Sequence, residues 1–277
     1  MLLQRIITAL ITIPLVTAAI LWGGELVFLS LVLVFTALGL YEFFRAAIPP
    51  EHYRERFIGI TLGIFIVICV FVESRGYSAN GGSTYFLTLC GCAGSILALF
   101  VYHIFMAQDM AQTINRLALT VLGVFYISLF FSFMLLIHVR PGGPVLILFL
   151  LFVTWAGDAV SYFVGSWKGR HPLCPGISPK KTIEGAIGGL VGGIITALAC
   201  SVLLLKNASP LSSMCAGMGI NIMNQFGDLG ESVLKRAFGI KDSGSVFPGH
   251  GGALDRLDSL LFAAPFFYFW VTMAFPQ

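Results

Sequence analysis

Charged residues that could bind a metal ion and phosphate groups gather in one stretch near the carboxyl end of the chain, residues 232–258, SVLKRAFGIKDSGSVFPGHGGALDRLD. The stretch contains two Lys, two Arg and three Asp around a glycine-rich centre. Only 10% of the whole chain is charged, and 57% of it is hydrophobic. Carboxylate oxygens are the ligands that Mg²⁺ prefers, and Lys and Arg bind phosphates. The stretch therefore predicts a site for a divalent metal ion and a polyphosphate.

The spacing of these residues indicates how helices would present them. Asp228, Ser232 and Lys235 are spaced i, i+4 and i+7, so a helix places them on one face, with Glu231 beside them.

Two further carboxylates, Asp255 and Asp258, are spaced i, i+3 at the start of the last apolar run. The segment 248–252 (PGHGG) can turn sharply and bring the two acidic segments together. His250, within that turn, is either a ligand or base, or a structural residue of the loop.

A second polar segment, SPKKTIEG at residues 178–185, gathers two Lys, hydroxyl groups and a Glu where a helix should begin. Thr182 is the expected N-cap, and a helix N-terminus suits an anion. Lys180 also fits a basic flank of a membrane helix, whereas Lys181 beside the capped helix fits that interpretation less well. The glycines that follow at four-residue spacing predict a close-packing helix face: Gly185, Gly189 and Gly193.

Asp158, in the segment WAGDAVSYF, lies within an apolar run that ends near Trp167. An ionisable side chain inside a membrane-spanning run is costly to bury, and it usually faces a cavity or a charged or polar partner. Ser161 and Tyr162 are one turn further on and could extend a polar face. The alternative is a structural hydrogen bond between helices.

Apolar runs long enough to cross a bilayer recur along the 277 residues, which is typical of a polytopic membrane protein and not of a soluble domain. The continuous runs also differ from the alternating pattern of a β-barrel. We expect an all-α transmembrane bundle of about nine helices, at residues 6–22, 26–44, 57–72, 85–105, 117–137, 144–167, 183–205, 209–226 and 259–275.

The Lys and Arg residues predict the orientation of this bundle. With nine spans, thirteen of the sixteen fall on one side: Arg5, Arg45, Arg54, Arg56, Arg116, Lys168, Arg170, Lys180, Lys181, Lys235, Arg236, Lys241 and Arg256. The positive-inside rule then places the N-terminus and the charged stretch in the cytoplasm and the C-terminus outside. We expect one membrane domain, with scaffold helices in 1–140, a catalytic region in 141–277, and cytoplasmic loops at 168–182 and 227–258.

The charged stretch resembles the signature of the phosphatidate cytidylyltransferases, also called CDP-diacylglycerol synthases. The matching residues are Ser232, Lys235, Arg236, Lys241, Asp242, His250, Gly251, Gly252, Asp255, Arg256, Leu257 and Asp258. The segments at 158–162 and 178–185 also resemble recurrent stretches of that family. The resemblance implies that CTP and phosphatidate react at the cytoplasmic face of the inner membrane, giving CDP-diacylglycerol and pyrophosphate. It also implies Mg²⁺, with K⁺ as a second cation, and a protein that is often a homodimer.

The resemblance further implies roles for individual residues. Asp228 and Asp255 would hold the metal, and Lys181, Lys235 and Arg236 complete the expected catalytic set. The expected substrate-binding residues are Asp158, Ser178, Lys180, Thr182, Glu184, Ser232, Lys241, Asp242, His250, Gly251, Gly252, Arg256 and Asp258. Asp158 is expected to act near the lipid head group or the metal.

Two other functions use similar residues or spans. A CTP-dependent lipid kinase needs the same types of Asp, Lys and Arg, but releases phospholipid and CDP. A transporter fits the number of spans, although transporters usually carry polar residues in both halves and here the first half has almost none in its spans. Walker A, HExxH and G-x-S-x-G motifs are all absent from the sequence.

Overall fold

A computed structural model describes residues 14–80, 85–106, 109–205, 209–244, 246 and 251–274, without the side chains of 77–80 and 111. This part of the chain is almost entirely helical, which confirms the predicted all-α membrane protein. Seven of its helices are long and apolar enough to cross a membrane: Gly24–Ala47, Pro50–Gly76, Phe86–Met106, Gln112–His138, Gly143–Lys168, Ile183–Leu203 and Leu254–Ala274.

These seven helices coincide with the second to seventh and the ninth of the predicted spans. Residues 14–22 are helical and form the end of the first predicted span, the start of which lies outside the described residues. The eighth predicted span falls in α9 (Pro210–Ala237), which is 28 residues long but carries several polar side chains and is not among the seven. The count of nine therefore remains a prediction.

Contacts within the chain define two compact units, each described here by itself. Unit 1 contains Met1–Arg140 and Asp242–Leu257, and unit 2 contains Pro141–Lys241 and Asp258–Gln277. Part of the charged stretch therefore belongs to each unit.

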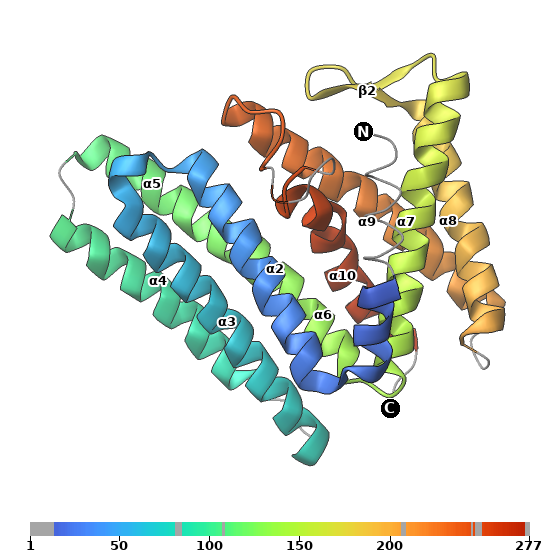
Figure 1. Cartoon of the computed structure of the whole chain (residues 1–277), viewed down its shortest axis with the longest axis horizontal. Helices are drawn as coiled ribbons and strands as arrows, with labels where there is room; N and C mark the ends of the chain where they lie inside the picture. The colour runs from blue at the N-terminus through green and yellow to red at the C-terminus, as the bar shows by residue number, and fades with distance from the viewer. Residues whose placement is uncertain are drawn as a thin grey trace. The chain divides into compact units, whose positions relative to one another are not determined.

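Unit 1 is built on antiparallel helices (Figure 1). Its elements are α2 (Gly24–Ala47), the short 3₁₀ turn η1 (Pro50–His52), α3 (Tyr53–Asn80), α4 (Phe86–Met106), α5 (Met110–Gly123), the π-helical turn η2 (Val124–Leu129) and α6 (Phe130–His138). Pro49 and Pro50, which cannot continue a helix, lie between α2 and α3. An ion pair of 3.2 Å between Glu25 and Arg75 joins the start of α2 to the end of α3, so the two helices run antiparallel.

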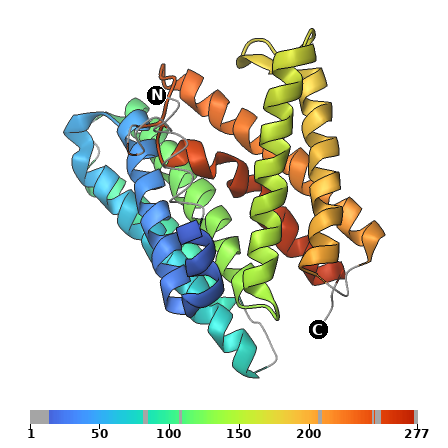
Figure 2. The ribbon, with the colours of Figure 1, turned by 45° about the vertical axis from the view of Figure 1, so that its right-hand side comes forward.

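Unit 2 contains α7 (Gly143–Lys168), α8 (Ile183–Leu203), α9 and most of α10 (Leu254–Ala274). The predicted loop 168–182 contains an antiparallel hairpin of β1 (Pro172–Cys174) and β2 (Ser178–Thr182), in which Pro172 pairs with Thr182. Figure 2 shows α8 beside α7, with which it packs most extensively.

The glycines of α8 make this packing close. A Cβ at Gly189 would lie 2.9 Å from the carbonyl oxygen of Gly157 on α7, and one at Gly192 would lie 2.7 Å from the side chain of Val160. The predicted small-residue packing face of α8 is thus confirmed.

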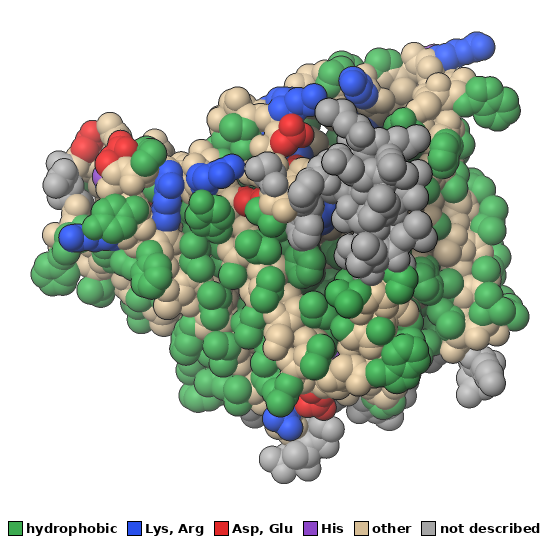
Figure 3. All heavy atoms as spheres, viewed as in Figure 1, with side chains coloured by type: hydrophobic (Ala, Val, Ile, Leu, Met, Phe, Trp, Pro, Cys, Tyr) green, Lys and Arg blue, Asp and Glu red, His purple; other side chains and the backbone are tan. Residues whose placement is uncertain are grey.

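Hydrophobic side chains cover the sides of the helices on the face that Figure 3 shows, and charged side chains gather towards the helix ends. In unit 2, the outward residues of α8 are large and apolar, including Ile187 (58% exposed), Ile195 (61%) and Val202 (76%). A water-soluble protein rarely exposes such a continuous apolar face, whereas lipid tails cover it without cost.

Candidate active site

One face of α9 carries four polar side chains of unit 2. Asn224, Asp228, Glu231 and Lys235 are spaced i, i+4, i+7 and i+11, so they follow the same side of this helix. The Lys235 ammonium lies 2.6 Å from the Glu231 carboxylate, which is fully buried. The helix therefore presents Asp228 and Lys235 as the sequence predicted, while Ser232 is half-buried beside them.

The β hairpin brings Lys181 to this face of α9. The Lys181 Nζ atom lies 2.5 Å from the Asp228 carboxylate, and the two side chains are 27% and 38% exposed. Next to Lys181, Thr182 Oγ1 accepts a hydrogen bond of 3.1 Å from Gly185 N, which confirms the predicted N-cap of α8. Because the ion pair is partly open to solvent, either partner can exchange it for a ligand.

Asp158 and Asp258 place two more carboxylates near α9. Asn224 Nδ2 donates a hydrogen bond of 2.6 Å to Asp158 Oδ1 on α7. Asp258, on α10, is close enough to Glu231, Asp228 and Asp158 for their negative charges to repel. Three helices of unit 2 thus contribute four neighbouring carboxylates, with Lys181 and Lys235 as paired cations.

These carboxylates fit a divalent cation by their chemistry, since Mg²⁺ prefers hard oxygen ligands and its charge would offset their repulsion. Asn224 Oδ1 is also buried and accepts no hydrogen bond within the described part of the chain. Among the described residues, however, no group of three or more Asp, Glu, His or Cys side chains is arranged to hold a metal ion. Phosphate oxygens or water would have to supply the remaining ligands.

Asp255 belongs to unit 1, where it closes the loop before α10. Its Oδ2 atom accepts hydrogen bonds from Gly252 N (2.8 Å) and Ser243 N (3.2 Å). Gly251 has a φ of +83°, and a Cβ there would lie 2.7 Å from Asp255 Oδ2. Glycine at 251 is therefore required both by the left-handed backbone and by the approach of this carboxylate. Asp228 and Asp255 fall in different units, so their pairing as metal ligands remains a prediction.

Glu184 has a clear structural role at the base of the hairpin. Its carboxylate lies 2.6 Å from His171 Nδ1 and accepts hydrogen bonds from the backbone N–H groups of Arg170 and His171. Arg236 also contacts the hairpin, because its Nε donates to the Ile177 carbonyl at 3.4 Å. These contacts join the hairpin to α8 and to the end of α9.

The other predicted substrate-binding residues occupy the same polar segments. Ser178 and Lys180 lie on β2; Lys241 and Asp242 are exposed after α9; Arg256 is exposed in the first turn of α10. His250 lies outside the described residues. Of the three residues that could have formed one polar face on α7, Ser161 faces Gly189 of α8, whereas Tyr162 is 71% exposed. That these residues extend one polar face with Asp158 remains a prediction.

Sequence reasoning did not include Asn224 among the site residues, and it named Glu231 without predicting its buried ion pair with Lys235. Along α9, Asn224 lies four residues before Asp228 and Glu231 lies three residues after it. This helical spacing is the signal that could have found both.

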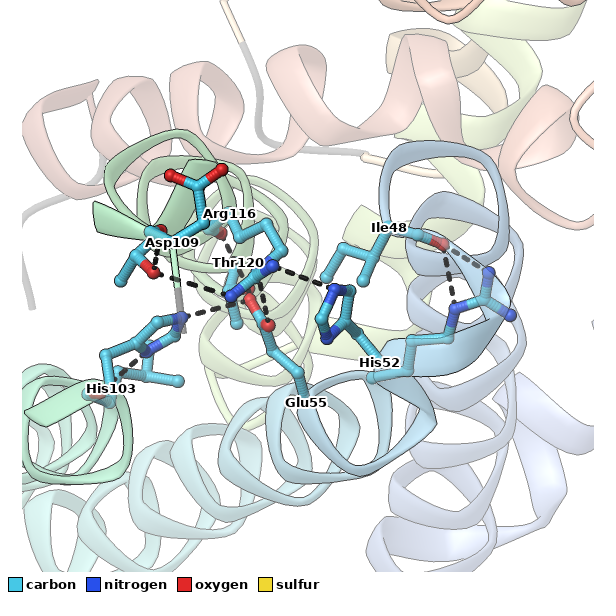
Figure 4. Close-up of polar contacts among 10 residues, drawn as sticks. Ile48, His52, Glu55, His103, Asp109, Arg116 and Thr120 are labelled. Carbon is cyan, nitrogen blue, oxygen red and sulfur yellow. Dashed lines mark hydrogen bonds and ion pairs between the residues drawn. The ribbon is translucent and has the colours of Figure 1, made fainter. Parts of the chain in front are cut away.

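A second polar cluster, in unit 1, was also missed (Figure 4). Glu55 on α3 is 1% exposed and lies 3.2 Å from both His103 Nε2 and Arg116 Nε, and it accepts a hydrogen bond from Thr120 Oγ1 at 2.9 Å. Arg116 also contacts His52 at 2.8 Å. This cluster connects α3, α4 and α5 and stabilises the packing of these helices.

Comparison with known proteins identifies the family that carries these features. The model of the cytidylyltransferase family matches residues 3–274. The chain belongs to this family. A phosphatidate cytidylyltransferase of Bacillus subtilis is 30% identical over 274 residues, covering 98% of this chain and 97% of the relative.

Two further relatives of this cytidylyltransferase bear the same name. The phosphatidate cytidylyltransferase of Thermotoga maritima is 38% identical over 178 residues, covering 61% of this chain and 64% of the relative. The one from Synechocystis is 30% identical over 300 aligned positions, covering 99% of this chain and 97% of the relative. Cytidylyltransferases generally use a divalent metal, which the carboxylates of unit 2 suit chemically.

Proposed function

We propose that this cytidylyltransferase converts CTP and phosphatidate to CDP-diacylglycerol and pyrophosphate in phospholipid biosynthesis. The observation that carries the proposal is the Lys181–Asp228 pair, set among acidic side chains in a unit whose helices expose apolar faces to lipid. Such a site can hold the phosphate of a substrate whose acyl chains remain in the bilayer. Family membership over almost the whole chain supports the same reaction.

The chemistry of the reaction explains why the site has cations and carboxylates but no obvious nucleophile. The phosphate of phosphatidate is already anionic at neutral pH, so one of its oxygens can attack the α-phosphorus of CTP directly. A new P–O bond forms in line with the bond to the β-phosphate, which breaks and releases pyrophosphate. The protein must mainly hold two polyanions together and stabilise the charge of the leaving group.

Individual residues have expected roles in this reaction. Asp228 and Asp255 are the proposed ligands of Mg²⁺, with K⁺ as a second cation, and such ions would offset negative charge on the phosphates. Lys181 and Lys235 have flexible ammonium groups, which can leave their carboxylate partners for a phosphate oxygen. Arg236, Lys241 and Arg256 are the further proposed phosphate contacts.

The transfer assay tests this function directly. Purified protein is incubated with phosphatidate, CTP labelled in the cytidine ring and Mg²⁺, and label is measured in the lipid phase. We expect labelled CDP-diacylglycerol and equimolar pyrophosphate, and loss of both when a chelator removes the metal. Labelled CDP with a newly phosphorylated lipid would instead indicate the kinase. Folded protein that transfers no label with several acyl compositions would contradict the proposal.

We also propose that the chain crosses the inner membrane nine times, with the carboxylates and lysines of unit 2 facing the cytoplasm. The proposed assembly is a homodimer. Within unit 1, the junction of α2 and α3 has Arg45, Arg54 and Arg56, whereas the opposite end of α3 has Arg75. This distribution supports a cytoplasmic α2–α3 junction.

A phosphatase fused to the C-terminus of the full chain should be active and a fluorescent protein there should be dark. The reverse result would contradict the orientation.

A further inference from the structure

Glu42 is a buried carboxylate in the last turns of α2, a helix that is long and apolar enough to cross a membrane. It is only 1% exposed. Burying a carboxylate in such a helix is costly unless the side chain has partners that compensate for lost water. Glu42 therefore needs a role, although it lies about 200 residues before the charged stretch.

The partners of Glu42 come from the residues that lead into α10. Its Oε2 atom accepts hydrogen bonds from Ser243 Oγ (3.0 Å) and from the backbone N–H of Leu254 (2.9 Å), all within unit 1. The first N–H groups of a helix have no partner inside it, and a side-chain oxygen usually accepts from one of them. Here Glu42 provides that oxygen from another helix.

The same small network fixes Asp255. Ser243 Oγ donates to Glu42 and accepts from Asp255 N (3.3 Å), while Ser243 N and Gly252 N donate to Asp255 Oδ2. Ser243 thus connects the two carboxylates through its hydroxyl and its backbone. Moving Glu42 would free Ser243 and the Leu254 N–H, and with them the start of α10.

Two glycines allow the backbone to come this close to Glu42. A Cβ at Gly244 would lie 2.6 Å from the carboxyl carbon of Glu42, and one at Gly252 would lie 2.7 Å from the same atom. Any other residue at either position would push the loop away from the carboxylate. Gly244 and Gly252 therefore both pack directly against the carboxylate of Glu42.

We propose that Glu42 is a positioning residue for the transfer reaction, which orients Asp255 by holding Ser243 and the first turn of α10. The inference rests on the proposed cytidylyl transfer, in which Asp255 is a metal ligand. Glu42 touches neither substrate in this role. Its effect on the reaction comes entirely from the placement of Asp255, and small misplacements of a reacting group are costly.

Three substitutions and one matched control test this role. Glu42→Ala removes the acceptor, Ser243→Ala removes the hydroxyl that connects the two carboxylates, and Glu42→Gln keeps an oxygen that can accept both hydrogen bonds. Glu55→Ala is the control, because Glu55 is equally buried in unit 1 and belongs to the separate cluster of Figure 4. Each protein is assayed for kcat, for KM of both substrates, for its melting temperature, and for amide hydrogen exchange in peptides containing residues 251–257.

We expect Glu42→Ala to lower kcat about 10- to 100-fold, with both KM values within about threefold, because binding groups stay while Asp255 is misplaced. Exchange at 251–257 should be faster in Glu42→Ala and Ser243→Ala, and Glu42→Gln should recover much of the activity. Glu55→Ala should lower the melting temperature, but it should neither lower kcat in this way nor speed up exchange at 251–257.

Several results would overturn the proposal: wild-type kcat in Glu42→Ala, unchanged exchange at 251–257, or an equal fall of kcat in Glu55→Ala. If Glu42→Ala does not fold, Ser243→Ala decides, and wild-type kcat and exchange in that variant would refute the role. Failure of the wild-type protein to transfer cytidylyl groups would refute the proposed function instead, while the exchange measurement would still report on the network.

Discussion

Asp228→Asn and Asp255→Asn should each lower cytidylyl transfer by about a thousandfold, the range seen when one strong charge-stabilising group is removed from an active site. Both variants keep the size of the side chain and lose its charge. The amide introduced by Asp255→Asn still has an oxygen that can accept from Ser243 N and Gly252 N, so the loop before α10 should persist. The loss would therefore come from the missing negative charge at the proposed metal ligand.

The measurement is kcat at saturating CTP, phosphatidate and Mg²⁺, with size-exclusion profiles and melting temperatures to show that each variant folds. Glu25→Gln is a suitable control, because it removes a carboxylate at the start of α2 that is 47% exposed and pairs with Arg75 of α3. We expect that control to retain activity. Near-wild-type turnover in either Asp variant would refute its assignment as a metal ligand.

Lys181→Met is the second substitution with a large expected effect. It removes the cation that lies 2.5 Å from Asp228 and leaves this carboxylate among Asp158, Glu231 and Asp258. It also removes a proposed phosphate contact. We expect kcat/KM for CTP to fall about 100- to 1000-fold, as for the removal of a group that stabilises developing charge.

Lys168→Met provides the matched control for Lys181→Met. Lys168 lies at the end of α7, close to the same hairpin, but its ammonium stacks on the Trp167 ring at 4.5 Å. The two substitutions change the net charge equally, so a general effect of surface charge would lower activity in both. Equal activity of the two variants, at whatever level, would contradict a specific role for Lys181.

The local features of the fold were predictable because they depend on residues close together in sequence. Apolar runs of about twenty residues predict membrane helices, and seven of the predicted spans have matching helices in the described chain. The Thr182 cap was expected from a hydroxyl side chain where a helix should begin, and the polar face of α9 from spacings of three and four residues. Both are confirmed. The β hairpin at 172–182 was not predicted, since its strands are short and lack an alternating apolar pattern.

The sequence by itself determined the class of protein, the expected family and the segments that carry its charged residues. Only the tertiary structure decided which side chains meet: Lys181 with Asp228, Asn224 with Asp158, and Glu42 with Ser243 and Leu254. The physical reason is the distance along the chain. Spacing within one helix fixes which residues share a face, but the helix that approaches this face is chosen by packing. Glu42 is the clearest case, because a single carboxylate in an apolar helix gives no indication of a partner some 200 residues away.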